Sequence, residues 1–198
     1  MNYKEKSGYH MKNNINRLNP ALRFAITFLA LFLLLYYFNI LFFGLTSPGG
    51  HYNSFLAEHV NYIHWLRRGL LKSSAQVLQW LGFRTIINEY ELLVAGRGII
   101  QLVYSCLGLG VMSFFTAFVL CYPKLWWQKL WFLISGLLVI QLLNILRFVL
   151  LALYWHGSQQ HIIDHHTLFN GFIYLLIMLG LYFWVKDANH QRPATHED

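Results

Sequence analysis

Residues 125–155 read LWWQKLWFLISGLLVIQLLNILRFVLLALYW, and the only charged residues in this run are Lys129 and Arg147. A helix of 31 residues is about 46 Å long, whereas the hydrocarbon core of a bilayer is about 30 Å thick. The run therefore predicts a membrane-spanning helix that tilts, kinks or projects beyond the bilayer. Gln141 and Asn144 interrupt its apolar character, as do the two charges.

Three further apolar runs have the character of membrane spans, namely residues 21–45, 102–121 and 168–185. About 20 apolar residues are enough to cross the hydrocarbon core. The first run is too long for a signal peptide, and no clear cleavage site of small residues follows it, so we expect it to be retained. The sequence thus predicts about four transmembrane helices.

The overall composition supports an all-α integral membrane protein. Hydrophobic residues make up 57% of the 198 residues and charged residues 12%, which is about half the usual charged share. So much apolar mass excludes a disordered chain, and two cysteines make a disulfide scaffold a poor fit. The formal charge of +7 would indicate a nucleic-acid partner in a soluble protein. Here the basic residues flank the spans, so we expect no nucleic acid and a bilayer as the partner.

The placement of lysine and arginine predicts the topology. Residues 1–20 form a basic tail that we expect to be disordered and cytoplasmic, residues 21–186 form the transmembrane domain, and residues 187–198 form a second cytoplasmic tail. The turn at 122–129 is also basic, whereas 156–167 contains neither lysine nor arginine. By the positive-inside rule, both termini of this multi-pass protein lie in the cytoplasm.

The segment between the first two spans is then on the outside of the cell membrane. It carries five basic residues, but long loops follow the charge rule weakly. Residues 51–83 mix apolar and charged residues, and five of them recur at helical spacing, namely Phe55, His59, Ile63, Leu66 and Leu70, which predicts an interfacial amphipathic helix. Residues 84–103 are rich in β-branched residues and contain Gly96 and Gly98, which predicts a short outer hairpin.

Three residues whose side chains could take part in catalysis are predicted to lie at the same height in the membrane. Cys106, Arg147 and His166 each lie 18 to 20 residues from the nearest lysine that marks the inner surface. At about 1.5 Å per residue, all three stand roughly 27–30 Å from that surface. A thiolate can attack a peptide carbonyl, an imidazole can move the proton, and a guanidinium can stabilise the oxyanion.

Each of these residues also has a simpler interpretation. Cys106 can be a small buried hydrophobic residue, and Arg147 can reach outward to the lipid headgroups. His166 can belong to a polar cluster that caps the last helix. His161 and His165, four residues apart, can bind a metal ion, but no HExxH motif or cysteine pair accompanies them. We therefore expect no metal site and no cofactor.

Neighbouring residues fit a supporting role. Gly108 and Gly110 would allow a substrate backbone to approach Cys106, although small residues also serve helix packing in membranes. Asn144 lies one helical turn before Arg147 and can orient the guanidinium or bind a substrate amide. An interhelical hydrogen bond is the alternative for this asparagine.

Three short motifs together resemble the exosortase/archaeosortase family. They are Ser105-Cys106-Leu107-Gly108, then Asn144-Ile145-Leu146-Arg147, then His166 followed by Asn170 and Tyr174. The resemblance covers about residues 95–185 and identifies the chain as a short variant. It departs from the family pattern at Leu107, where a small residue is usual, and at Asn170, where glycine is frequent.

The resemblance implies a function. Members are polytopic membrane enzymes that cut carboxy-terminal sorting signals from membrane-anchored proteins and pass the product to a surface acceptor. It implies a cysteine protease or transpeptidase with catalytic residues Cys106, Arg147 and His166 at the outer membrane face. An amine, a glycolipid or water would release the product. The adjacent His165 could take the place of His166, but the spacing to Tyr174 favours His166.

Two other function classes fit the same residues. A non-catalytic membrane scaffold or assembly factor could keep the polar residues for binding alone. A transporter could use the histidine cluster to handle a metal ion or haem. Replacement of Cys106 by serine separates an enzyme from a scaffold, and bound metal or a haem absorption band would reveal the transporter.

Overall fold

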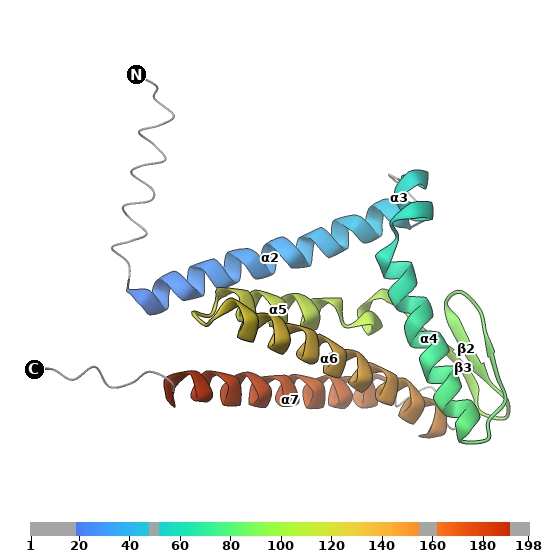
Figure 1. Cartoon of the computed structure of the whole chain (residues 1–198). Helices are drawn as coiled ribbons and strands as arrows, with labels where there is room; N and C mark the ends of the chain where they lie inside the picture. Colours follow the sequence, from blue (N-terminus) through green and yellow to red (C-terminus); the bar gives the residue numbers. More distant parts are fainter. Residues whose placement is uncertain (1–18, 48–51, 155–161, 191–198) are drawn as a thin grey trace, which may run out of the picture.

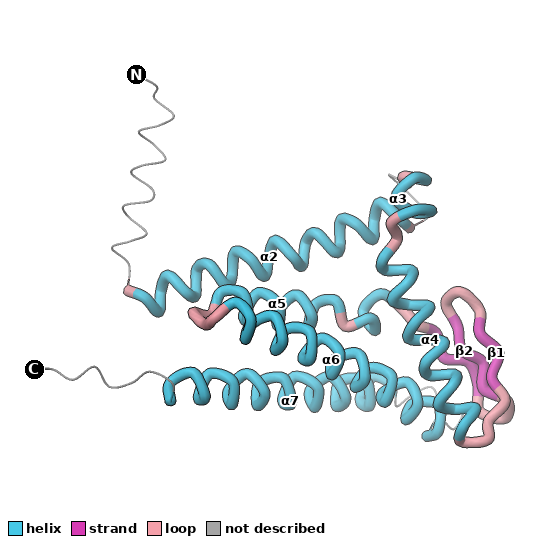
Figure 2. The backbone as a smooth tube through the Cα atoms, viewed as in Figure 1, coloured by secondary structure: helices cyan, strands magenta, loops and turns pink. Residues whose placement is uncertain are grey.

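Four helices run side by side, and a layer of two further helices and a small sheet (residues 54–101, named the outer layer) crosses one end of them (Figures 1 and 2). This computed structural model describes residues 19–47, 52–154 and 162–190, with side chains described only for 171–186 in the last range. The two expected tails therefore lie almost wholly outside the described residues. The helices that run side by side in this part of the chain are α2, α5, α6 and α7.

Helix α2 spans Pro20–Thr46 and confirms the first predicted helix. Its start follows from local chemistry, because Pro20 stands in the first turn and the Asn19 side chain accepts a hydrogen bond from the Ala21 amide. It is long and apolar enough to cross a membrane, and only 6% of its most apolar 18-residue stretch is buried inside the protein. Most of its surface is therefore available to lipid.

Helix α6 spans Trp126–Tyr154, as the long apolar run predicts. Its 29 residues measure about 43 Å, and it also has the length and hydropathy of a membrane span. Helix α7 spans Ile162–His190, so it begins earlier than predicted and continues past the expected end of the domain. The expectation of a loop over 156–167 is wrong for 162–167, which are helical.

The predicted helix over 102–121 is interrupted. Residues Tyr104–Leu107 form a 3₁₀ turn, η1, and α5 begins only at Leu109 and ends at Cys121. Gly108 lies between them in the left-handed region, with φ 74°, which glycine adopts without strain. The 13 residues of α5 rise about 20 Å, less than the thickness of a hydrocarbon core.

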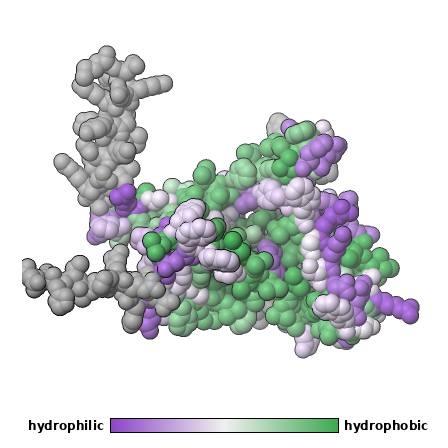
Figure 3. All heavy atoms as spheres, in the orientation of Figure 1, coloured by the Kyte–Doolittle hydropathy of each residue, from purple (hydrophilic) through white to green (hydrophobic). Residues whose placement is uncertain are grey.

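Four complete spans are therefore not confirmed. Among the described residues, the two helices with the length and hydropathy of a span are α2 and α6. Residues 109–121 and 171–186 form shorter apolar helices. The apolar surface seen over the helices in Figure 3, with polar residues at the two ends, is nevertheless that of a membrane protein.

The predicted amphipathic helix of the outer layer consists of two helices, α3 over Ser54–His59 and α4 over Tyr62–Trp80. The break occurs because Asn61 caps α4 by accepting a hydrogen bond from the His64 amide. Phe55 is 64% exposed and does not join the buried face. That face belongs to α4 alone and consists of Ile63, Arg67, Leu70, Leu71, Ser74, Ala75 and Leu78.

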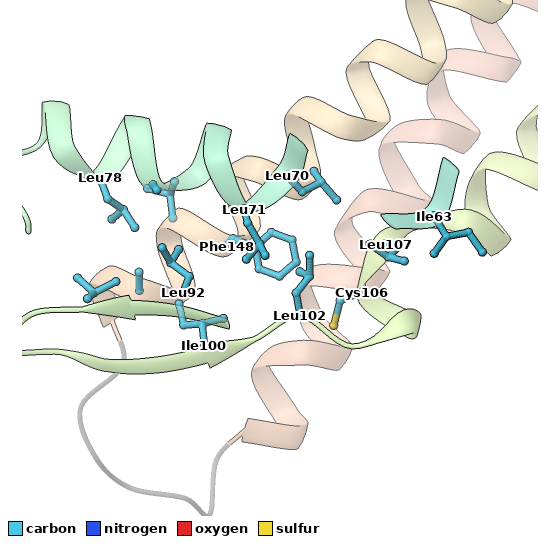
Figure 4. Close-up of a cluster of buried hydrophobic side chains, with 14 of the residues drawn as sticks. Ile63, Leu70, Leu71, Leu78, Leu92, Ile100, Leu102, Cys106, Leu107 and Phe148 are labelled. Atoms are coloured by element: carbon cyan, nitrogen blue, oxygen red, sulfur yellow. The ribbon is translucent and has the colours of Figure 1, made fainter. Parts of the chain in front are cut away.

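The predicted hairpin is an antiparallel sheet of three strands in the order β1-β2-β3. The strands are β1 (Thr85–Ile87), β2 (Glu91–Val94) and β3 (Gly98–Gln101). Figure 4 shows Leu92 and Ile100 of this sheet facing the buried side of α4, with Phe148 of α6 beside them. This cluster of α4, the sheet and α6, named the outer core, also includes Leu102, Cys106 and Leu107, and it therefore positions the turn that carries Cys106.

Two hydrogen bonds from basic side chains join the ends of helices to neighbouring elements. Arg97, between β2 and β3, donates a hydrogen bond to the Leu153 carbonyl near the carboxy-terminal end of α6. At the opposite end, Lys129 Nζ donates to the Leu120 carbonyl at 2.8 Å. Cations near the last carbonyls of a helix are favourable because those groups carry the negative end of the helix dipole.

Candidate functional site

Cys106 lies in the η1 turn at the edge of the outer core. Its side chain is 5% exposed, and Figure 4 shows it next to Leu102. The turn is closed by a hydrogen bond from the Cys106 amide to the Val103 carbonyl at 3.0 Å. The left-handed residue Gly108 then redirects the chain into α5. Cys106 thus sits in a turn before the helix and not within a span.

Arg147 of α6 reaches this turn from a segment 41 residues away in sequence. Its Nη2 atom donates a hydrogen bond to the Cys106 sulfur at 3.1 Å. The Arg147 side chain is 3% exposed, so it is directed into the protein and not toward the lipid headgroups. A buried cation in a membrane helix is costly unless it has partners, and such residues commonly belong to functional sites.

Asn144 holds the segment that follows the cysteine. Its side-chain amide lies 3.5 Å from the Leu107 carbonyl and 3.4 Å from Gln141 Oε1. A Cβ atom on Gly108 would lie 2.6 Å from Asn144 Nδ2, which is too close. Glycine is therefore required at 108 for its φ angle and for the approach of Asn144.

Gln141 is a member of this polar group that the sequence interpretation left out. Its Nε2 atom lies 2.8 Å from the Met112 sulfur of α5. The signal was present in the sequence, because Gln141, Asn144 and Arg147 follow one another at intervals of three in an apolar helix. Residues three apart share a helical face, so the three polar side chains point toward α5 and η1.

A cavity of about 240 Å³ adjoins this group. Arg147 and Asn144 line it from α6, and Ser105 lines it from η1. Cys106 borders this lining through its sequence neighbour Ser105 and through its hydrogen bond to Arg147. The remaining lining residues come from α2, η1, α5, α6 and α7: Tyr36, Tyr104, Gly108, Leu109, Gly110, Val111, Ile140, Ile173 and Tyr174.

Two tyrosines of the cavity lining, Tyr36 and Tyr104, were not anticipated from the sequence, and neither was Tyr62, which lies near Tyr104. Burial, together with the neighbouring Tyr104, raises the pKa of Tyr62 to about 12. Burial and the neighbouring Tyr36 also raise the pKa of Tyr104 above its ordinary value. The Tyr62 hydroxyl is protonated near neutral pH, as an ordinary tyrosine is, and it donates a hydrogen bond to Asn39 Oδ1.

The side chains of His161, His165 and His166 lie outside the described residues. The backbone of His165, His166 and Asn170 belongs to α7, whereas His161 lies outside the described residues altogether. The histidine contribution to the site therefore stays a prediction, as does the metal alternative. Among the described residues no group of three His, Cys, Asp or Glu could hold a metal ion.

Comparison with known proteins gives one match. A family model described as transmembrane exosortase matches residues 18–184 of the chain. The match includes residues 46–95, where the sequence motifs showed no resemblance. No match was found among the curated proteins or among the solved structures.

Proposed function

Because the chain belongs to the transmembrane exosortase family, we propose that it is a membrane-embedded cysteine protease or transpeptidase that cleaves carboxy-terminal sorting signals. One observation carries the proposal most directly, namely the hydrogen bond of 3.1 Å between Arg147 and the Cys106 sulfur. A guanidinium held against a buried thiol is suited to anionic chemistry at that sulfur. The same two residues occupy the motif positions for which the resemblance implies catalysis.

In the proposed reaction, the Cys106 sulfur attacks the scissile carbonyl carbon. A carbon–sulfur bond forms, the carbonyl oxygen becomes an oxyanion, and Arg147 stabilises this charge because its guanidinium stays protonated. Collapse of the intermediate breaks the carbon–nitrogen bond and leaves a thioester on Cys106. The proton taken from the thiol passes through His166 to the leaving amine. Water or an amine-bearing acceptor then attacks the thioester and restores the thiol.

The position of α7 supports the assignment of His166. Residues seven apart share a helical face, so position 166 corresponds to Ile173, which is 5% exposed and lines the cavity. Position 165 corresponds in the same way to Phe172, which is 52% exposed. Positions 166 and 173 thus share one face of the α7 backbone, and this register is the argument for keeping His166 as the proposed base.

We propose membrane-anchored proteins with a carboxy-terminal sorting signal as substrates, and an amine or glycolipid as the acceptor. The cavity has lining residues from α2 and α7 as well as from the central helices, so substrate would meet it at the level of the membrane. The proposed topology has both termini in the cytoplasm and the cavity toward the outside.

The test is processing of a candidate substrate in cells. Tagged proteins from the same genome that end in a short motif, an apolar span and a basic tail are expressed with the wild type, Cys106→Ser or Cys121→Ser. Cys121 lies at the opposite end of α5 and gives a matched control for cysteine loss. We expect loss of the processed form with Cys106→Ser and normal processing with Cys121→Ser.

Processing that persists in Cys106→Ser at the wild-type level would contradict the proposal. Substrate that co-purifies with Cys106→Ser but also stays uncleaved with the wild type would favour the scaffold.

A further inference from the structure

A chain of hydrogen bonds connects the outer layer with two membrane helices. The Tyr62 hydroxyl, at the start of α4, donates to Asn39 Oδ1 of α2 at 2.5 Å. Asn39 Nδ2 donates to Ser113 Oγ of α5 at 3.0 Å. The Ser113 hydroxyl in turn donates to the Leu109 carbonyl at 2.8 Å. Asn39 is the only side-chain amide in α2, and here it bonds to residues of two other helices.

This network lies one helical turn from the cavity wall. Tyr36 precedes Asn39 by three residues and lines the cavity from α2, whereas Gly110 precedes Ser113 by three residues and lines it from α5. The α2 and α5 sides of the cavity are in close contact at this point, since a Cβ atom on Gly110 would lie 3.6 Å from Tyr36 Cε2. The rotation of α2 about its axis therefore determines how far the Tyr36 ring extends across the cavity.

Apolar packing alone specifies that rotation weakly. Toward the inner end, α2 packs on α5 through edge-to-face aromatic pairs such as Phe28 with Phe114 and Phe24 with Phe118. In a membrane such contacts compete with lipid tails of similar character, whereas interhelical hydrogen bonds have directional geometry. The Tyr62 hydroxyl is protonated at physiological pH even at the ordinary tyrosine pKa of about 10, and burial raises that pKa further, so this donor is present.

We infer that Tyr62, Asn39 and Ser113 are positioning residues that hold the α2 wall and so set the size of the group that the cavity admits beside Arg147. That this group belongs to a substrate rests on the proposed function. The control of cavity width by the network does not, and it can be measured without catalysis. A wall positioned in this way would give the enzyme selectivity by size for the residues next to the scissile bond.

The test uses a reporter cysteine in the cavity. Ser105 is exposed and lines the cavity, so Ser105→Cys is made together with Cys106→Ser and Cys121→Ser in the full-length protein. Labelling rates are measured with N-ethylmaleimide and with the bulkier fluorescein maleimide, and their ratio reports the width of the entrance. Tyr62→Phe and Ser113→Ala remove one hydroxyl each, and Tyr37→Phe is the matched control, because Tyr37 is 61% exposed on α2.

We expect Tyr62→Phe and Ser113→Ala to raise the relative rate of the bulky reagent about fivefold, the shift in population that loss of one ordinary hydrogen bond produces. Tyr37→Phe should leave the ratio unchanged, and Gly110→Ala should lower it by adding a methyl group at the wall. Equal ratios in Tyr62→Phe, Ser113→Ala and Tyr37→Phe would overturn the inference. An equal rise in the labelling rates of both reagents would also overturn it. Such a rise would indicate that the whole region loosens and that the network does not control the width of the entrance. Since the reporter protein lacks Cys106, neither outcome depends on the catalytic proposal.

Discussion

Cys106 and Arg147 come from different elements, are each at least 95% buried, and meet through a hydrogen bond of 3.1 Å. Removal of a guanidinium from water costs several kcal/mol even after relaxation, so the protein must offset this cost with partners. Asn144 continues the polar group toward the Leu107 carbonyl. The site is thus a small polar region enclosed by the apolar outer core and the membrane helices.

The role of Arg147 predicts that lysine cannot replace it. Lysine keeps the positive charge but offers a single ammonium group in place of the planar guanidinium with its several donors. Arg147→Lys should therefore lose at least about tenfold in processing, since one charged hydrogen bond contributes roughly 1.5–3 kcal/mol. The measurement compares the processed fraction with the amount of enzyme in the membrane. Full processing by Arg147→Lys would show that the positive charge alone is sufficient at this position, and it would contradict a need for the guanidinium group.

Gly108 predicts a second effect at the residue scale. Alanine at this position must adopt a left-handed conformation, which costs about 1–2 kcal/mol, and its Cβ would collide with Asn144. Gly108→Ala should lower the thermal midpoint of the purified protein and abolish processing. Gly44→Ala is the control, because nothing lies within 4 Å of the added carbon there. Equal midpoints for the two variants would show that the turn tolerates a side chain.

Counting residues from the inner lysines was sufficient to predict that Cys106 and Arg147 lie at one height. It could not predict Tyr36 or Gln141 as neighbours, because height says nothing about the rotation of a helix. The histidine assignment stays a prediction at the level of side chains. The structure adds a packing reason for Gly108, since a Cβ atom there would meet the Asn144 side chain, while the approach of a substrate backbone to this glycine stays a prediction.

At the scale of elements, length and apolar character were enough to predict α2 and α6. They were not enough for the segment 102–121, because a run of apolar residues does not reveal a left-handed break at Gly108. The third strand and the split between α3 and α4 were missed for a similar reason. Both depend on caps and turns of one or two residues, such as Asn61, that interrupt an otherwise continuous pattern.

The α5–α6 pair supplies a prediction about packing. A Cβ atom on Gly136 of α6 would lie 2.1 Å from the Phe115 ring, and Phe115 is 3% exposed in a second core cluster with Val119 and Ile140. Gly136→Ala should therefore separate the two helices and destabilise the protein by about 1–3 kcal/mol, as overpacking usually does. Thermal unfolding in detergent provides the measurement. Because Gly180 has nothing within 4 Å, Gly180→Ala should unfold like the wild type, and similar behaviour of Gly136→Ala would disprove the close packing.

At the scale of the whole molecule, apolar residues cover the middle of the helices, and polar residues gather at the two ends (Figure 3). Lys124 and Lys129 bind carbonyls at the end opposite the outer layer. The orientation that places α4 and the sheet outside the cell membrane stays a prediction.

The proposed topology predicts which cysteines a membrane-impermeant reagent reaches in intact cells. In a chain with Cys106→Ser and Cys121→Ser, Asn88→Cys between β1 and β2 should be labelled. Trp127→Cys, at the exposed start of α6, should be labelled only after the membrane is opened. A reporter fused after Asp198 should show cytoplasmic activity. The reverse labelling pattern would invert the orientation and place the cavity toward the cytoplasm.

The central claim is that Cys106 forms a thioester with the substrate, and its most direct test is detection of that adduct. Wild type, Cys121→Ser and Arg147→Lys are each purified with a co-expressed candidate substrate, and the peptide that contains Cys106 is examined by mass spectrometry. We predict a substrate-derived acyl group on Cys106 that neutral hydroxylamine removes, present in wild type and Cys121→Ser and strongly reduced in Arg147→Lys. Efficient processing of the substrate with no acyl group on Cys106, or with the group on another residue, would contradict the account.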